Sequence, residues 1–217
     1  KRELGFKKSK KSVFTFFPNL SELKTKENEK IKLKDVLTMT AGLHPLGEDY
    51  TIESQELLMR DILSQPQDTF PGSAFRYNIE CPYLLGGIIF NLTGKQVEEY
   101  AREKLFEPLK INHYKWINEN GVTDCQSNLF LMPRDMMKIG LMVLNNGKWQ
   151  GKQIVPENWI RESTKYRVAE SEFFNYGYQW WHRSAENNSW WEKSTTTEEH
   201  DMNIALGFGG QYIFIVS

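Results

Sequence analysis

The sequence predicts a mixed fold of the α/β (α+β) class, with helices over about residues 34–165 and strands over about residues 174–217. Two features carry this prediction. In the middle of the chain, apolar residues recur at helical spacing between prolines that start helices and glycines that stop them. After Phe174, aromatic and β-branched residues bounded by glycine replace that pattern, which is typical of strands.

Residues 1–34 are expected to form a polar connector around a short apolar patch at 13–20. Helices bounded by proline or glycine signals are expected after it, at residues 34–40, 54–64, 83–92, 97–105 and 133–147, with a short one from Pro156. The 83–92 helix has the clearest ends. Pro82 suits a first turn, where its missing N–H costs nothing, and Gly94 suits a left-handed stop.

Two strands joined by a long polar loop are expected at the end of the chain. The first is expected around the aromatic run Tyr176 to Trp181. The second is expected from Ile204 to Val216, with glycines at its centre.

Composition excludes several functional classes. The 217 residues are 40% hydrophobic, enough for one domain or one two-lobed domain, and a net charge of −1 gives no electrostatic footprint for nucleic acid. No apolar stretch reaches the roughly 20 residues of a membrane helix, and no segment of these residues is expected to be a signal peptide. Both ends resemble cuts, because the chain starts at Lys1 rather than at a methionine and stops at Ser217 inside a predicted apolar strand.

The two cysteines and four histidines give no metal-ligand spacing, so we expect no metal site. Cys81 and Cys125 are most simply buried thiols, and one disulfide between them stays an open alternative.

Tyr77 is the first candidate functional residue. It follows the turn signal Phe70-Pro71-Gly72 and stands just before an apolar helix. The unpaired N–H groups of a helix start favour negative charge, so the phenol is a candidate proton acceptor with a lowered pKa. The alternative is a core tyrosine whose hydroxyl has an ordinary hydrogen-bond partner.

The glycine cluster Gly207-Phe208-Gly209-Gly210-Gln211 is the second candidate. At the start of a strand, Gly209 and Gly210 would let a ligand approach the backbone and let N–H groups point at a developing oxyanion. A β-bulge or close packing is the structural alternative.

Five ordered blocks of the sequence resemble the serine β-lactamase-like hydrolases, namely class C β-lactamases and penicillin-recognising esterases and peptidases. They are LTMTAGLH (37–44), PGSAFRYNIECPYLLGGII (71–89), TGKQVEEYAREKLFEPLKI (93–111), LMPRDMMKIGLMVLNNGKWQGKQIVPENW (131–159), and the closing pair YGYQWW and GFGGQYIFIVS. The resemblance covers nearly the whole chain. It implies a helical lobe packed on an antiparallel sheet that is incomplete at both ends, so that residues 1–217 form a partial domain of this type.

The resemblance also implies roles for individual residues. Tyr77 stands where the family has the tyrosine that helps to move the proton of the nucleophile. Asn78 would contact substrate, although many class C members have asparagine one position later, where this chain has Ile79. Phe208 stands where the family strand has a cation, and Gly209, Gly210 and Gln211 would lie on the substrate side.

The nucleophile of such enzymes is a serine in a Ser-x-x-Lys pair, which places an amine one helical turn from the hydroxyl. Only Ser21 and Lys24 have this spacing, and they lie in the predicted polar connector, after the place where the pair belongs. We therefore expect Ser21 to be non-catalytic and the true pair to precede Lys1.

The resemblance implies a serine hydrolase of bacterial type that acts on a small ester, amide or peptide through an acyl-enzyme and needs no cofactor. It slightly favours a periplasmic or secreted location. The chain alone is expected to be inactive. The alternative is a binding or scaffold relative that has lost the nucleophile and the strand cation, and whether the protein is an enzyme stays open at this point.

Overall fold

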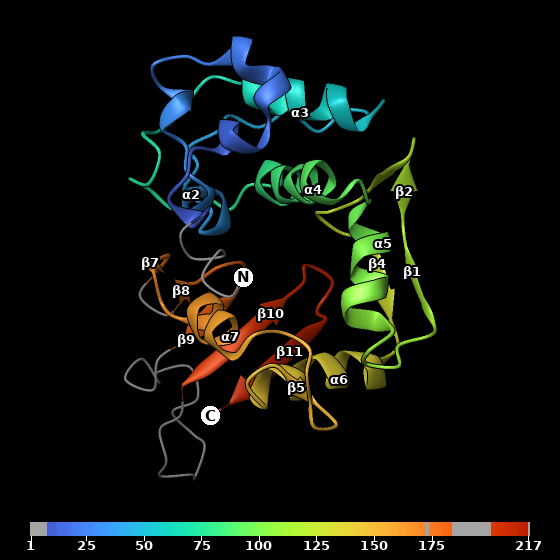
Figure 1. Ribbon diagram of the computed structural model, residues 1–217. Coiled ribbons are helices and arrows are strands. Elements are labelled where there is room, and N and C mark those ends of the chain that lie inside the picture. Colours follow the sequence, from blue (N-terminus) through green and yellow to red (C-terminus); the bar gives the residue numbers. More distant parts are fainter. Residues whose placement is uncertain (1–7, 172–173, 184–200, 217) are drawn as a thin grey trace. The chain divides into compact units, whose positions relative to one another are not determined.

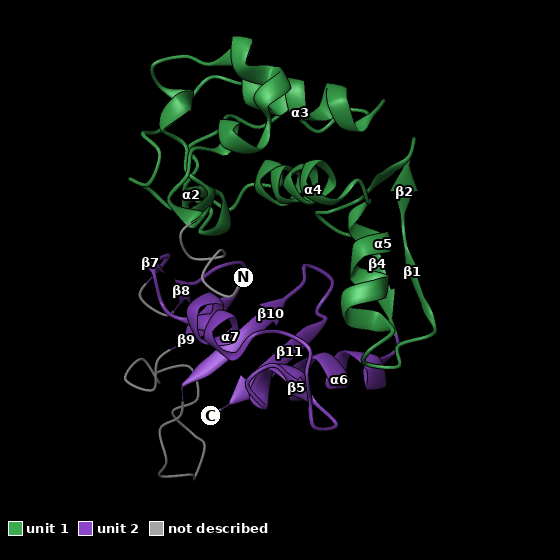
Figure 2. Ribbon diagram, in the orientation of Figure 1, with its two compact units in different colours: residues 1–131 green, residues 132–217 purple. Residues whose placement is uncertain are grey.

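The computed structural model describes residues 8–171, 174–183 and 201–216 (Figure 1). The chain forms two compact units, residues 1–131 and 132–217 (Figure 2). Mixed helix and antiparallel sheet confirm the predicted fold class. A long polar loop was predicted between the two strands, and its residues 184–200 lie outside the described residues.

Unit 1 is mainly helical. Its helices are η1 (Val13–Phe16), η2 (Pro18–Leu23), η3 (Asn28–Lys30), α2 (Leu33–Leu37), α3 (Gln55–Ser64), α4 (Glu80–Thr93), α5 (Val97–Ala101) and the π-helix η4 (Arg102–Phe106). Two small antiparallel pairs, which the sequence did not predict, join β1 (Tyr114–Trp116) to β4 (Leu129–Leu131) and β2 (Asn118–Glu119) to β3 (Val122–Thr123).

The N-terminal segment is part of the core of unit 1, so its prediction as a connector was wrong. Val13, Phe17 and Leu20 are each at most 1% exposed. A Cβ atom on Gly87 of α4 would lie 2.2 Å from Met59 Sδ and 3.1 Å from Phe17 Cε1, which shows how closely this segment, α3 and α4 pack. The lysines and glutamates of residues 21–34 hide this apolar contribution in the sequence.

The predicted helix ends are largely confirmed. Ser54 caps α3 by accepting a hydrogen bond from Leu57 N at 3.2 Å. Gly94 ends α4 with φ of +73°. The start of α4 lies at Glu80, before Pro82, because Asn78 Oδ1 accepts a hydrogen bond from Cys81 N at 3.2 Å and satisfies a free amide of the first turn.

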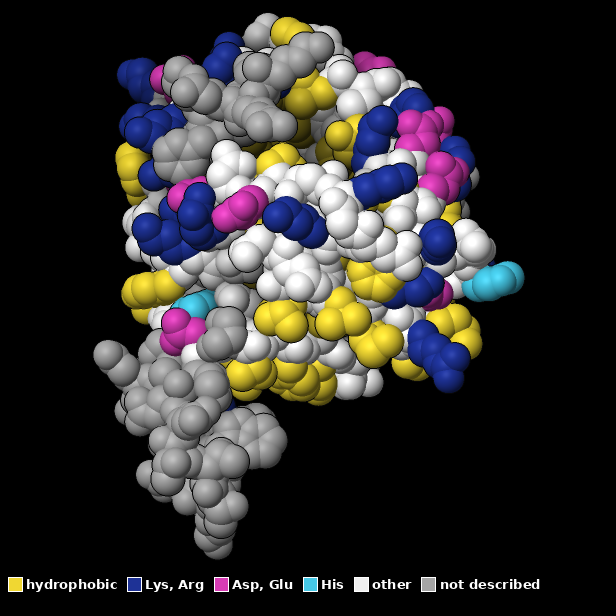
Figure 3. All heavy atoms as spheres, turned by 60° about the horizontal axis from the view of Figure 1, so that its bottom comes forward, with side chains coloured by type: hydrophobic (Ala, Val, Ile, Leu, Met, Phe, Trp, Pro, Cys, Tyr) yellow, Lys and Arg dark blue, Asp and Glu magenta, His cyan; other side chains and the backbone are white. Residues whose placement is uncertain are grey.

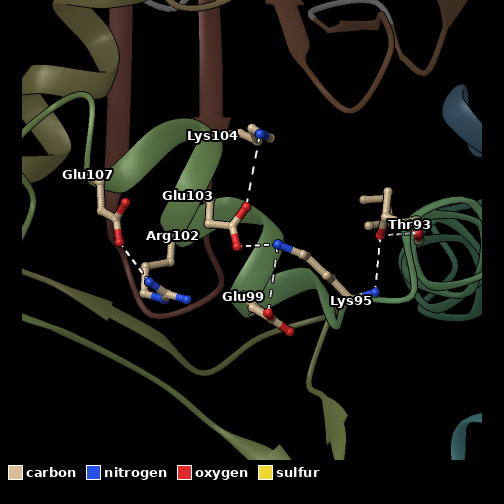
Figure 4. A network of polar contacts seen from close by, with 8 residues as sticks. Thr93, Lys95, Glu99, Arg102, Glu103, Lys104 and Glu107 are labelled. Carbon is tan, nitrogen blue, oxygen red and sulfur yellow. Dashed lines mark hydrogen bonds and ion pairs between the residues drawn. The ribbon is translucent and has the colours of Figure 1, made fainter.

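A network of charged side chains follows the end of α4 (Figure 4). Lys95 Nζ lies between Glu103, to which it hydrogen-bonds, and Glu99 Oε1 at 3.9 Å, and Arg102 bonds Glu107 at 2.7 Å. These contacts hold α5 and η4 as one continuous helical segment. Because the side chains are partly exposed, each pair is worth little by itself.

Unit 2 contains a five-stranded antiparallel sheet in the order β11-β10-β9-β8-β7. Its elements are α6 (Pro133–Leu144), β5 (Lys148–Trp149), β6 (Lys152–Gln153), α7 (Glu157–Thr164), β7 (Val168–Ala169), β8 (Asn175–Tyr176), β9 (Trp181–Arg183), β10 (Met202–Leu206) and β11 (Tyr212–Val216). α6 packs on β11, where a Cβ on Gly140 would lie 2.9 Å from Ile213. Thus α6 and α7, predicted as part of the helical region, belong to the compact unit that contains the sheet.

The segment from Ile204 to Val216 is a hairpin, so its prediction as one strand was wrong. β10 and β11 pair from Met202 with Val216 to Leu206 with Tyr212, and residues 207–211 form the loop. Gly210 has φ of +83°, a conformation that glycine adopts without strain. The apolar residues on either side of the glycines are typical of one strand, and only the positive φ reverses the chain.

β11 is the outer strand of the described sheet, and its outward side chains are apolar. Tyr212, Phe214 and Val216 are 45%, 55% and 46% exposed, whereas Ile215, on the side of α6, is 5% exposed. Figure 3 shows hydrophobic side chains gathered on the side that faces downward in Figure 1, where α6 and β11 lie.

Candidate active site

Tyr77 lies between a turn and the start of α4, as the sequence predicted. Ser73 N donates to Phe70 O at 3.0 Å, and Gly72 has φ of +83°, so residues 70–73 form a tight turn. The chain then runs without helix or strand to α4. The Tyr77 side chain is 53% exposed and is therefore accessible to a substrate.

The backbone around Tyr77 is held by the segment that follows α2. Gly72 N donates to Thr40 O at 2.8 Å, and Arg76 N donates to Met39 O at 2.9 Å. Met39 is 1% exposed and has φ of +58°, a left-handed conformation that is strained for a side chain of this size. Such strain persists only where surrounding contacts fix it, so this segment is a rigid support for residues 72–77.

The electrostatics of Tyr77 differ from the sequence prediction. Burial raises the pKa of its phenol, and the neighbouring Cys81 thiol adds to the increase. The prediction of a lowered pKa was wrong because α4 begins three residues after Tyr77, and the effect of a helix N-terminus falls off within a turn. At neutral pH the phenol is protonated and can donate a hydrogen bond.

Asn78, predicted to contact substrate, points inward. It is 7% exposed, and its Nδ2 donates to Leu43 O at 3.1 Å while its Oδ1 accepts from Cys81 N. Both ends of the amide are therefore used within unit 1. Ile79, which stands where many class C members have asparagine, is 41% exposed beside Tyr77.

A charged group lies next to Tyr77 in sequence. Arg76 forms an ion pair with Asp68 Oδ2, and His44 Nδ1 lies 2.9 Å from Asp68 Oδ1. The hydrogen bond with His44 is the main cause of the lowered pKa of Asp68, and Arg76 adds to it. This surface cluster links three segments that the sequence separates by up to 32 positions.

The glycine cluster forms the loop between β10 and β11 in unit 2. Gly207 N donates to Gln211 O at 3.0 Å, and Gly210 N donates to Gly207 O at 3.2 Å, so these two amides are used inside the loop. A Cβ on Gly209 would lie 2.7 Å from Gln211 Oε1. The absence of side chains thus lets the Gln211 amide fold across the loop.

Phe208 stands at the tip of this loop and is fully exposed. Its ring offers no charge, so the loop cannot supply the strand cation that the resemblance implies. Tyr77 comes from unit 1 and the loop from unit 2, so the two predicted parts of the site belong to different units.

Ser21 and Lys24 lie in or beside the 3₁₀ helix η2 and are both exposed. Lys24 Nζ lies 5.8 Å from the centre of the Phe14 ring. A 3₁₀ helix stacks residues i and i+3 with poorer hydrogen-bond geometry and rarely continues, so it offers no extended apolar helix to bury a nucleophile.

Among the residues that the structure describes, no group of three or more His, Cys, Asp or Glu side chains could hold a metal ion, and no helix is long and apolar enough to cross a bilayer. Cys81 and Cys125 are both free thiols, and burial raises the pKa of each.

Sequence reasoning missed Glu80. Its carboxylate is 1% exposed, and its Oε1 accepts a hydrogen bond from Leu46 N at 2.8 Å. The available signal was a charged residue at the head of a helix whose next ten residues carry no charge.

With the fold and these contacts established, comparison with known proteins identifies the family. The Beta-lactamase family model matches residues 13–216. The chain belongs to the Beta-lactamase family. No curated protein matches the sequence significantly.

Solved structures share the fold of this family member. A Bacillus anthracis protein assigned as a 6-aminohexanoate-dimer hydrolase is 21% identical, with a TM-score of 0.71 over 95% of this chain and 57% of its own. A Bacteroides dorei protein assigned as a β-lactamase is 19% identical, with a TM-score of 0.77 over 96% of this chain and 66% of its own.

A D-stereospecific amidohydrolase from a Streptomyces species is 13% identical, with a TM-score of 0.65 over 90% of this chain and 66% of its own. At such identities the likeness shows the fold. The chain spans about three fifths to two thirds of the length of these structures.

Proposed function

We propose that the protein is a serine hydrolase of the Beta-lactamase family that cleaves an ester, amide or peptide bond through an acyl-enzyme. The proposal depends chiefly on Tyr77. Its phenol is exposed at the head of α4, on a backbone fixed by Gly72 N and Arg76 N, and the sequence around it resembles the tyrosine motif of the family. The hydrolases among the matching structures support the reaction class.

In this mechanism Tyr77 transfers the proton of a serine nucleophile. The raised pKa makes the isolated phenol a donor, so accepting a proton requires a nearby cation that favours the phenolate. The lysine of a Ser-x-x-Lys pair would supply that charge. We propose that this pair lies outside residues 1–217, since Ser21 and Lys24 are exposed and lack a helix that buries them.

We further propose that the backbone of the loop Gly209-Gly210-Gln211 contacts the substrate, because residues without side chains let a ligand approach the main chain closely.

The hydrolase proposal is tested on a longer form of the protein that includes the proposed Ser-x-x-Lys segment. Tyr77→Phe should lower kcat for p-nitrophenyl esters or nitrocefin by about 10²–10⁴-fold, the usual contribution of a proton-transfer group. Tyr166→Phe is the matched control, because that ring is 50% exposed in unit 2. A wild-type rate in Tyr77→Phe would rule out the proposed role.

The second candidate function is a binding protein without turnover. Phe208 favours it, since the family cation is replaced by an exposed uncharged ring. If the longer protein shows no hydrolysis and no covalent adduct with a fluorophosphonate or a labelled penicillin, yet binds these compounds reversibly, the binding function takes precedence.

A further inference from the structure

Side chains alternate in direction along residues 77–80. Tyr77 and Ile79 are 53% and 41% exposed, whereas Asn78 and Glu80 are 7% and 1% exposed. Ile79 already has helical backbone angles and Glu80 is the first residue of α4, so the start of this helix presents one face to solvent and the other to the core. The two outward residues are those that a substrate can touch.

The two inward residues bind the same distant loop, residues 43–46. Asn78 Nδ2 donates to Leu43 O at 3.1 Å, and Glu80 Oε1 accepts from Leu46 N at 2.8 Å. The side chains of Asn78 and Glu80 therefore tie the start of α4 to this loop at two points.

The loop is itself fixed from its other side. Gly42 O accepts from Asp68 N at 2.8 Å, and His44 N donates to Pro66 O at 3.1 Å. A Cβ on Gly42 would lie 2.2 Å from Thr69 O, which leaves no room for the loop to shift toward residues 66–69. A rigid loop can transmit position, whereas a mobile one cannot.

Packing alone does not explain a glutamate at position 80. Its second carboxylate oxygen, Oε2, is buried and has no hydrogen-bond partner among the residues that the structure describes. Burying a carboxylate that is only partly hydrogen-bonded is unfavourable, and an apolar residue would fill the space at lower cost. What an apolar residue cannot do is orient the Leu46 amide.

We propose that Asn78 and Glu80 are positioning residues that fix the Tyr77 phenol by locking the start of α4 to residues 43–46. In this proposal Asn78 affects the reaction by fixing the position of Tyr77, and it does not contact the substrate. The expected effect on the reaction rate rests on the proposed function, because the position of the phenol matters for catalysis only if Tyr77 transfers a proton. Misplacement of a reacting group by about 1 Å can cost about 10²-fold in rate.

The test compares Asn78→Ala, Glu80→Ala and the conservative Glu80→Gln, which keeps an acceptor for Leu46 N. The matched control is Asn28→Ala. Asn28 is 3% exposed and also ties segments of unit 1 together, with Nδ2 donating to Leu23 O at 2.9 Å and Leu63 O at 3.1 Å. Within the described part of the chain, its hydrogen bonds reach neither residues 43–46 nor residues 77–80.

Two measurements use the full 217-residue chain. Amide hydrogen exchange should lose protection at Cys81 in Asn78→Ala and at Leu46 in Glu80→Ala. The ¹³C-labelled Tyr77 ring should shift or broaden in both alanine variants, stay near wild type in Glu80→Gln, and stay unchanged in Asn28→Ala. An unchanged Tyr77 ring in both alanine variants, with the two amides deprotected, would overturn the proposal.

A third measurement uses the longer form of the protein that includes the proposed Ser-x-x-Lys segment. Asn78→Ala and Glu80→Ala should lower kcat by up to about 10²-fold with little change in KM, and Glu80→Gln should restore most of the rate. An equal loss in Asn28→Ala would overturn positioning in favour of general destabilisation. If Tyr77→Phe is fully active, the proposed function fails, while the shift of the Tyr77 ring still decides whether these residues position it.

Discussion

Gly42 lies in the loop that supports Tyr77, and its surroundings predict how much unfolding free energy an alanine at this position should cost. Gly42 and Gly94 have nearly the same backbone conformation, with φ of +74° and +73°. They differ in surroundings. A Cβ on Gly42 would lie 2.2 Å from the Thr69 carbonyl oxygen, whereas nothing lies within 4 Å of a Cβ on Gly94. The pair therefore separates backbone strain from steric overlap.

Both alanine variants carry the strain of a left-handed residue, about 1–2 kcal/mol. Gly94→Ala should lose only this amount of unfolding free energy. Gly42→Ala should lose about 1–3 kcal/mol more, because the clashing atom is backbone and the Gly42 carbonyl is itself held by Asp68 N. The expected total for Gly42→Ala is thus about 2–5 kcal/mol.

Urea unfolding of the 217-residue chain, followed by far-ultraviolet circular dichroism, measures both values. The variants must show similar dependence on urea for the comparison to hold. Equal losses in the two variants would refute the packing of Gly42 against Thr69. The same Gly42→Ala sample should also show a displaced Tyr77 ring, whereas Gly94→Ala should not.

Three further predictions concern ionisation, solubility and the nucleophile. The pKa of Tyr77 is raised, and burial and Glu98 raise the pKa of Tyr114 to about 12, so the folded state holds these protons more tightly than the unfolded state. The contribution of these tyrosines to stability should therefore be fully present below about pH 10 and be lost as the pH rises above it. Alkaline unfolding curves should show this loss, and it should be less steep in Tyr114→Phe. Phe214 lies on the exposed side of the outer strand β11, so Phe214→Lys should reduce light scattering by the chain at little cost in stability. Ile215 lies on the buried side, so Ile215→Lys should unfold unit 2. A Phe214→Lys protein that scatters as strongly as wild type would contradict an association through this strand. Fluorophosphonate or labelled penicillin should leave Ser21 unmodified in mass spectra of the chain, and the chain should show no turnover; a stoichiometric adduct on Ser21 would overturn the assignment of that serine as non-catalytic.

The predictions that succeeded from sequence were those with a local physical cause. Ser54 caps α3 because a hydroxyl at that position reaches Leu57 N, and Gly94 ends α4 because glycine tolerates a positive φ. Five ordered motif blocks were enough to predict the family, which the match over residues 13–216 confirms.

Some errors came from patterns that two structures share. Apolar residues on both sides of a glycine cluster occur within one strand and in a hairpin, and the choice depended on Gly210 adopting φ of +83°. The charged residues after Leu20 resembled a connector, although the aromatic residues before them enter the core against α3 and α4.

The sequence by itself determined that Tyr77 stands between a turn and an apolar helix, because the proline, glycine and helix signals are all close to it in the chain. Only the tertiary structure decided which neighbours face the same way. Asn78 and Glu80 turn inward because their partners, Leu43 and Leu46, lie 35 and 34 residues away in sequence. No local pattern of residue types records a contact of that range.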